Sequence, residues 1–183
     1  MFINRDQLLA GLGVLFIIFG AMIDVDVPWK DGAIPVTGQS LAVLVVAFVL
    51  GRKTGMLAIA VYLILGLLGL PIFANGASGI ATLMGGSGGF LYGFLVGGYA
   101  CGLLREKGYE RTYSHSLVAM AAGTALILIC GIAQLTFLYG FEKALQYGLL
   151  PFWPGAIVKI ILGAAIVHYI PLKRYPEKRD EAK

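Results

Sequence analysis

Long apolar segments, separated by short stretches rich in Gly, Pro and charged residues, dominate the pattern of hydrophobic and polar positions along the chain. The six apolar segments are Gln7–Val25, Gln39–Leu50, Thr54–Leu70, Gly88–Leu104, His115–Gly140 and Pro154–Ile170. Apolar residues are continuous within each segment and do not alternate with polar ones, which indicates helices and not the strands of a membrane barrel. The pattern therefore predicts an all-α integral membrane bundle of six transmembrane helices.

Two of the six segments depart from the usual length or position of a membrane span. The segment 39–50 has only twelve residues, whereas a spanning helix needs about 20. We expect it to be short, to extend into its flanks or to be partly re-entrant. The segment 7–25 follows Arg5 in the manner of a signal peptide, but it is too long and too quickly followed by further apolar segments. We interpret it as the first helix of the bundle.

The composition supports a membrane protein because 58% of the 183 residues are hydrophobic and only 13% are charged. Such a chain cannot cover its surface with polar groups, so the lipid bilayer is its expected surrounding. We expect residues 1–183 to form a single membrane domain with a short tail at residues 173–183. No soluble segment is large enough for an enzyme, and no apolar segment carries a cluster of Asp, Glu or His for catalysis or metal binding. The sequence therefore predicts neither catalytic activity nor a cofactor.

The distribution of Lys and Arg predicts how the bundle is oriented, because cytoplasmic loops carry the excess of these residues. Of the fourteen, eleven fall at one end of the predicted bundle together with both chain termini, and two, Lys30 and Lys143, fall at the other. The fourteenth, Lys159, lies inside an apolar segment. Both termini are therefore expected in the cytoplasm. The net charge of +4 is explained by topology, and nucleic-acid binding is not expected.

The two longest loops on the predicted external side carry Gly and Pro where a binding site would need them. Residues 24–38 end in Pro and Gly just before an apolar segment, and residues 71–87 contain no charge and many glycines. Glycines permit close backbone approach and positive φ, so the second loop can fold over a cavity and donate backbone N–H groups to a ligand. Glycines are also common as simple connectors and packing residues in membrane proteins. No Gly-Lys-Ser/Thr follows, which excludes a phosphate-binding loop.

Lys159 is the candidate functional residue that stands out most clearly in the pattern. It lies five residues after Pro154, and no Asp or Glu shares its apolar segment. A buried ammonium is costly in a membrane unless it faces a wet cavity or a partner, so Lys159 suggests a site. The alternative is that its long side chain reaches the membrane surface. In a cavity, an unpaired cation near the external side favours a small solute that carries a carboxylate.

Four motifs in one order give the sequence a resemblance to a known family. They are Ile34–Leu41 (IPVTGQSL), Gly69–Ala74 (GLPIFA), Gly88–Phe94 (GGFLYGF) and Gly148–Gly155 (GLLPFWPG), the last followed by Lys159. Together they resemble the BioY family, the biotin-specific S components of energy-coupling factor (ECF) vitamin transporters. The resemblance extends from about Ile34 to Ile170.

This resemblance implies a fold and a function beyond what the pattern alone gives. BioY proteins are compact six-helix subunits of the prokaryotic cell membrane that capture biotin at the external face. The loops 24–38 and 71–87 would then close the pocket. Such an S component docks on a transmembrane coupling protein and a pair of cytoplasmic ATPases, and its toppling in the membrane is thought to carry the vitamin inward. No Walker motif is present here, so ATP would be hydrolysed by those partners.

The match to the family's binding motif is incomplete at one position. In many relatives a Pro-Gly-Asp sequence is followed by Lys three residues after the Asp, whereas this chain has Ala156 at the Asp position and keeps Lys159. A missing acceptor for buried ureido N–H groups typically costs about 1 to 3 kcal/mol. Other groups would have to replace it, and the candidates are Asn75, Ser78, Gln39 and loop carbonyls.

The resemblance therefore gives a set of candidate residues and an alternative ligand. The predicted ligand-binding residues are Lys159, Asn75, Gln39, Ser78 and Tyr92, the last within the Gly88–Phe94 motif. If the cavity is apolar at Ala156, lipoate or a biotin precursor would fit better than biotin. Small residues on the first helix, including Ala10, Gly13 and Gly20, are a candidate docking face for the coupling protein.

Overall fold

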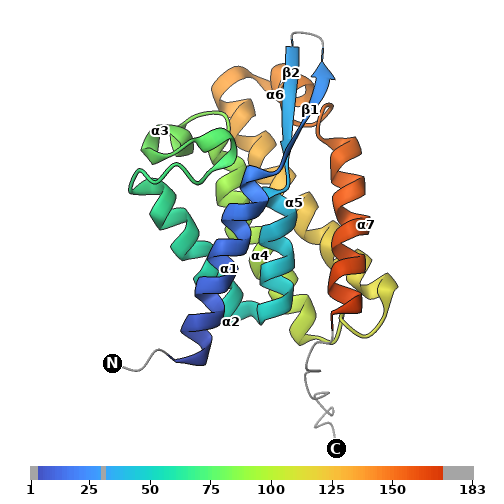
Figure 1. The fold of residues 1–183 in the computed structure, drawn as a ribbon. Coiled ribbons are helices and arrows are strands. Elements are labelled where there is room, and N and C mark those ends of the chain that lie inside the picture. The colour runs from blue at the N-terminus through green and yellow to red at the C-terminus, as the bar shows by residue number, and fades with distance from the viewer. Residues whose placement is uncertain (1–3, 30–31, 171–183) are drawn as a thin grey trace, which may run out of the picture.

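The computed structural model describes residues 4–29 and 32–170 and has seven α-helices, a short 3-10 helix and a two-stranded hairpin within those residues (Figure 1). The elements, in chain order, are α1 (Arg5–Met22), β1 (Asp24–Trp29), β2 (Gly32–Thr37), α2 (Gln39–Leu67), η1 (Ala74–Gly76), α3 (Gly79–Met84), α4 (Gly88–Glu106), α5 (Tyr113–Tyr139), α6 (Phe141–Gly148) and α7 (Trp153–Tyr169). Each predicted apolar segment corresponds to a helix or to half of one. The predicted tail at 173–183 lies outside the described residues.

The helix α2 reverses direction at Gly51, so it consists of two antiparallel halves. Gly51 has φ 78° and ψ 173°, which are not helical and are in a region that favours glycine. A Cβ on Gly55 would lie only 2.7 Å from the Cα of Ala47. Eight residues of straight helix would separate those positions by about 12 Å. The two predicted segments 39–50 and 54–70 are therefore confirmed as separate helical halves, and the shorter of them is short because the chain turns back.

A β-hairpin replaces the first predicted external loop and corrects the expectation of a purely α-helical chain. Strands β1 and β2 are antiparallel, with Asp24 opposite Thr37, and Gly38 N donates to Ile23 O at 2.7 Å just below them. The segment was expected to be a loop because it contains proline and glycine. Valines at alternate positions of β1 nevertheless favour a strand. Figure 1 shows the hairpin projecting from the end of the bundle opposite the start of α1.

Three short helices also lie outside the predicted apolar segments. Helix α3 and the 3-10 helix η1 occupy the loop between α2 and α4. Helix α6 follows α5 after Gly140, whose φ of 87° ends the long helix. It was missed because it is short and amphipathic, so its apolar residues do not form a continuous apolar segment. Gly148 at its end packs against Leu135 of α5, since a Cβ there would meet Leu135 Cδ1 at 2.4 Å.

Helix length and composition show which helices can cross a membrane. Among the described residues, α1, α2 and α5 are long and apolar enough to cross a membrane. The pair α6 and α7 passes the same criterion together, with a bend of 51° between the two helices. Within α2, the reversal at Gly51 gives two antiparallel apolar halves that pack against each other.

The core lies between α1, both halves of α2, α4 and α5, where small residues let the helices approach closely. Ala10, Gly13 and Gly20 of α1 are buried, and a Cβ on Gly20 would lie 2.5 Å from the Cβ of Ala42 in α2. Because these small residues pack inward, they do not form the exposed docking face that the sequence suggested. The exposed side of α1 carries large apolar residues such as Leu15 and Phe19.

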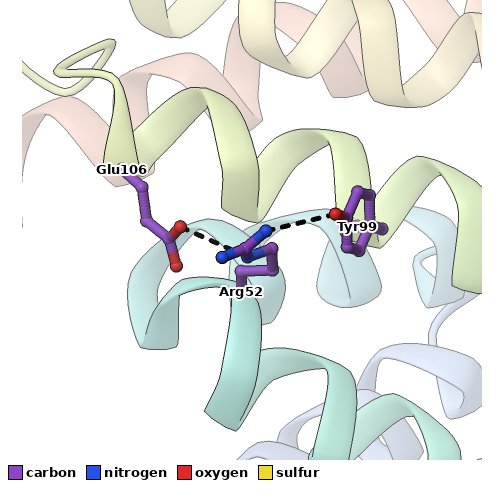
Figure 2. Close-up of polar contacts among 3 residues, drawn as sticks. All are labelled: Arg52, Tyr99 and Glu106. Carbon is purple, nitrogen blue, oxygen red and sulfur yellow. Dashed lines mark hydrogen bonds and ion pairs between the residues drawn. The ribbon is translucent and has the colours of Figure 1, made fainter.

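At the end of the bundle opposite the hairpin, α4 holds the turn of α2 (Figure 2). Arg52 Nε lies 3.2 Å from Glu106 Oε2, and Arg52 Nη1 donates to Tyr99 Oη at 3.1 Å. The guanidinium of buried Arg105 donates to the carbonyl oxygen of Val49, just before the break at Gly51. These contacts fix the turn and leave the opposite ends of the same helices to form the site.

Candidate functional site

A cavity of about 370 Å³ lies at the hairpin end of the bundle. Its wall is formed by the end of β2, the first turn of α2, the loop 73–77, α3, the start of α4, the end of α5, α6 and the start of α7. Its volume is within the range of small-molecule pockets, which is about 300 to 1,000 Å³. The cavity lies at the end of the bundle where the sequence predicted an external site.

One wall of the cavity is apolar and rich in aromatic rings. Phe90 of α4 and Phe152, which precedes α7, lie with ring centroids 5.9 Å apart at an angle of 45°. Phe94, Ile127 and Leu128 extend this wall into the bundle. Such a surface accommodates a flat or aliphatic ligand body by burying its apolar area.

Another part of the lining is polar and contains the predicted lysine. Lys159 lines the cavity, and its Nζ donates to Ser40 Oγ at 3.2 Å. Over residues 4–29 and 32–170, Lys159 has no carboxylate at ion-pair distance. A hydroxyl satisfies one N–H but does not neutralise the charge, so the ammonium can still bind an anionic or strongly accepting group.

Gln39 also lines the cavity and belongs to a buried chain of hydrogen bonds. Its Nε2 donates to Tyr62 Oη at 2.6 Å, and that hydroxyl donates to the carbonyl oxygen of Ile72 at 2.9 Å. Gln39 is 4% exposed and Tyr62 is fully buried. Sequence reasoning missed Tyr62, although a tyrosine inside an apolar helix generally needs a partner for its hydroxyl.

Asn75 lies in residues 68–87 between α2 and α4, a segment that lines the cavity and is called the covering loop below, and it has a left-handed conformation with φ 57°. The loop is anchored just before it, because Phe73 is 3% exposed and its ring lies against Gly66, where a Cβ would be 2.1 Å from the ring. Ala74 and Ala77 line the cavity beside Asn75. The loop thus contributes one polar side chain and two small residues to the site.

The structure brings three of the five predicted residues together and places two elsewhere. Lys159, Gln39 and Asn75 line the cavity, whereas Ser78 and Tyr92 are not among the lining residues. Tyr92 is 46% exposed and follows Leu91, which is buried and does line the cavity. Successive helical residues point about 100° apart, and in α4 Phe90 and Leu91 line the cavity while the next residue, Tyr92, points away from it. Ser78 uses its carbonyl oxygen to accept from Thr82 Oγ1 at 2.8 Å.

Ala156 lines the cavity one helical turn before Lys159 and offers no polar atom there beyond its backbone. Polar side chains that sequence reasoning did not name contribute elsewhere on the wall: Thr37, Ser40, Thr82, Ser87, Thr124 and Tyr147. Thr37 and Ser40 could have been found because they flank Gln39 in the Ile34–Leu41 motif. Thr124 lies in an apolar helix, and no motif marks it.

Gln134 of α5 fastens the far end of the covering loop. Its Nε2 donates to the carbonyl oxygens of Leu83 and Gly85 at 3.0 and 2.7 Å. Gly88 packs against the same group, since a Cβ there would lie 2.6 Å from Gln134 Nε2. The loop is therefore held at Phe73 and again at Leu83–Gly85, and residues 74–82 lie between the two anchors.

In the described part of the chain, no three His, Cys, Asp or Glu residues lie close enough together to hold a metal ion. Cys101 is buried and its Sγ donates to the carbonyl oxygen of Ala119 at 3.1 Å. The polar side chains that line the cavity can form hydrogen bonds with a ligand, and Lys159 adds a positive charge.

Comparison with known proteins gives a family match over nearly the whole chain: the BioY family matches residues 2–175. A biotin transporter BioY from Thermotoga maritima is 36% identical over 163 residues, covering 88% of this chain and 93% of that protein. A probable biotin transporter BioY from Pyrococcus horikoshii is 38% identical over 155 residues, covering 85% of this chain and 89% of the relative. The biotin transporter BioY2 from Lactococcus lactis is 40% identical over 136 residues, which is 72% of each chain.

A solved structure shares the fold. The crystal structure at 2.1 Å of the S-component for biotin from an ECF-type ABC transporter superposes with a TM-score of 0.79. The match covers 90% of this chain and 89% of that chain, at 24% sequence identity. The predicted S-component fold is therefore confirmed.

Proposed function

Because the chain belongs to the BioY family, we propose that it is the substrate-binding S component of an ECF-type transporter and captures biotin for uptake. The observation that carries the proposal is the cavity, whose lining combines the ammonium of Lys159 with the aromatic rings of Phe90 and Phe152. Among the described residues, that ammonium has no carboxylate at ion-pair distance. The relatives from Thermotoga maritima and Lactococcus lactis are biotin transporters, and the solved structure of the same fold is an S-component for biotin.

The cavity suits the chemistry of biotin. Biotin combines a fused apolar ring system with a ureido group and an aliphatic carboxylate. The wall formed by Phe90, Phe94 and Phe152 would pack against the rings, and Lys159 would donate to the carboxylate or to the ureido oxygen. Gln39 and Asn75 would pair with the remaining polar atoms of the ligand.

We further propose six membrane crossings with both termini in the cytoplasm and the cavity facing outward. The crossings would be α1, the two halves of α2, α4, α5 and α7, with α3 and α6 at the external surface. Three observations support this: the reversal at Gly51, the position of Arg52 and Arg105 at the end away from the cavity, and the start of α1 at that same end (Figure 1). The localisation would be the cell membrane of a prokaryote.

The partners of such a subunit would be a transmembrane coupling protein and two cytoplasmic ATPases. Support comes from the solved S-component of the same fold, which is described as part of an ECF-type ABC transporter. The chain has no Walker motif, so another subunit would have to supply the energy of ATP hydrolysis.

A second ligand class is favoured by one observation. Ala156 lines the cavity where an acceptor for ureido N–H groups would be useful, and lipoate or a biotin precursor would need that acceptor less. Calorimetry of the purified protein in detergent with biotin, desthiobiotin and lipoate separates these possibilities. The proposal expects saturable binding of one biotin per chain, with lipoate weaker. Saturable lipoate binding without biotin binding would reassign the ligand.

A further inference from the structure

We infer that Tyr62 is a positioning residue for the ligand: it orients the amide of Gln39 so that the carbonyl oxygen accepts from a ureido N–H, and it links that contact to the covering loop. The inference rests on the proposed capture of biotin. It identifies the acceptor that compensates for Ala156, and it gives a role to a buried tyrosine that lies outside the cavity wall.

The orientation of the Gln39 amide follows from counting protons. The hydroxyl of Tyr62 has a single proton, and the carbonyl oxygen of Ile72, 2.9 Å away, can only accept. The proton must therefore point to Ile72. The oxygen of Tyr62 is then left to accept, and the group 2.6 Å from it must be the NH₂ end of Gln39. The hydrogen-bond network therefore assigns the nitrogen and the oxygen of the Gln39 amide, which have nearly the same shape.

This arrangement leaves the carbonyl oxygen of Gln39 available. Among the described residues, no donor of the protein is hydrogen-bonded to that oxygen. Gln39 lines the cavity, and its neighbour Ser40 contacts the ammonium of Lys159. An acceptor and a cationic donor thus lie on adjacent parts of one wall. A ureido group presents the complementary pair, since its N–H groups donate and its oxygen accepts.

Without Tyr62, the amide of Gln39 would no longer be held in the orientation that leaves its carbonyl oxygen available to a ligand. A free amide can rotate by 180° and present NH₂ to the ligand, where two donors would face each other. A buried N–H that loses its acceptor costs binding, so fixing the amide in advance favours ligands with an N–H at that position. Tyr62 therefore acts through Gln39 and does not itself contact the ligand.

Tyr62 also touches the loop that covers the cavity. Its hydroxyl holds the backbone of Ile72, and its ring packs edge-on against Phe73 with centroids 5.6 Å apart at 74°. Phe73, Ala74 and Asn75 line the cavity directly after this anchor. The acceptor in the pocket and the base of the loop are thus held by one side chain. A ligand that engages Gln39 would stabilise the anchored loop, and an anchored loop would favour that engagement.

The test uses the full-length protein in detergent with biotin and with biotin methylated at either ureido nitrogen. The variants are Gln39→Met, Tyr62→Phe and the double variant, with Tyr169→Phe, an exposed tyrosine at the end of α7, as the control. Gln39→Met should weaken biotin binding by about 10- to 100-fold and should shrink the penalty for methylating one of the two nitrogens. Tyr62→Phe should weaken binding by about 3- to 10-fold in the parent protein and should have almost no effect in the Gln39→Met background.

Thermal unfolding in detergent checks that each variant is folded before affinities are compared. If Tyr62→Phe lowers affinity equally with and without Gln39, its role is merely structural and the inference fails. Unchanged affinity of Gln39→Met for biotin would also overturn it, while the proposed function would stand because biotin still binds. Absence of biotin binding by the unmodified protein would instead overturn the proposed function.

Discussion

The ammonium of Lys159 in α7 lies 3.2 Å from the hydroxyl oxygen of Ser40 in the first turn of α2. This contact joins two helices across the wall of the cavity and keeps the cation at the surface where a ligand would bind. The side chain does not extend away from the site, as it would if it reached for the membrane surface. The charge is therefore positioned for recognition.

Lys159→Met tests that role because it keeps the length of the side chain and removes the charge. We expect biotin binding to weaken by about 2 to 3 kcal/mol, or about 30- to 150-fold, with folding stability unchanged or raised. Calorimetry and thermal unfolding in detergent measure the two effects. A neutral biotin amide identifies the partner, since the substitution matters less for the amide only if Lys159 contacts the carboxylate. Equal affinity of parent and variant for biotin would remove Lys159 from the site.

Residues 74–82 should close over bound biotin, because they lie between the anchors at Phe73 and at Leu83–Gly85. At a biotin concentration 100 times its Kd, amide exchange in this segment should slow by up to about 100-fold. Residues 83–88 should already be slow without ligand. Hydrogen exchange followed by mass spectrometry resolves the two segments. Identical exchange of residues 74–82 with and without biotin would exclude this loop as the gate.

Gln134→Met should loosen the second anchor because the carbonyl oxygens of Leu83 and Gly85 lose their shared donor. We expect faster exchange at residues 83–88 and biotin binding weaker by about 3- to 10-fold. Gln146→Met is a matched control, since Gln146 belongs to α6 and is not among the cavity-lining residues. An effect of the same size in both variants would argue against a specific anchor.

The proposed topology predicts which positions are reachable from outside the cell. In a background with Cys101 and Cys130 replaced, cysteine at Asn75 or Ser87 should react with an impermeant thiol reagent in intact cells. Cysteine at Lys53 should react only after the membrane is opened. Asn75, Ser87 and Lys53 are all exposed in the structure, so burial would not explain a difference in labelling between these positions. The opposite labelling pattern would invert the topology.

The sequence predicted the helices well because uninterrupted apolar segments have few stable alternatives in a membrane. It also located the reversal in α2, since polar residues Arg52 and Lys53 interrupt the apolar pattern directly after Gly51. The hairpin was missed because its prolines favoured a loop. Helix α6 was missed because it is short and amphipathic, and a search for continuous apolar segments does not detect such a helix.

The candidate site was predictable only where a motif or a charge marked a residue. Lys159 is conspicuous as a charge in an apolar segment, and Gln39 lies inside a recognisable motif. Tyr92 does not line the cavity, and the sequence could not show this because α4 has apolar residues on most sides. The role of Tyr62 depends on Gln39, 23 positions away, and Ile72, 10 positions away, and such a network appears only in three dimensions.

Native mass spectrometry of the purified protein, mixed with equal concentrations of biotin, desthiobiotin and lipoate, tests the central claim most directly. The account predicts a dominant complex of one chain with one biotin, which the Lys159→Met variant forms much less at the same concentrations. A dominant lipoate complex, or no complex with any of the three, would contradict it.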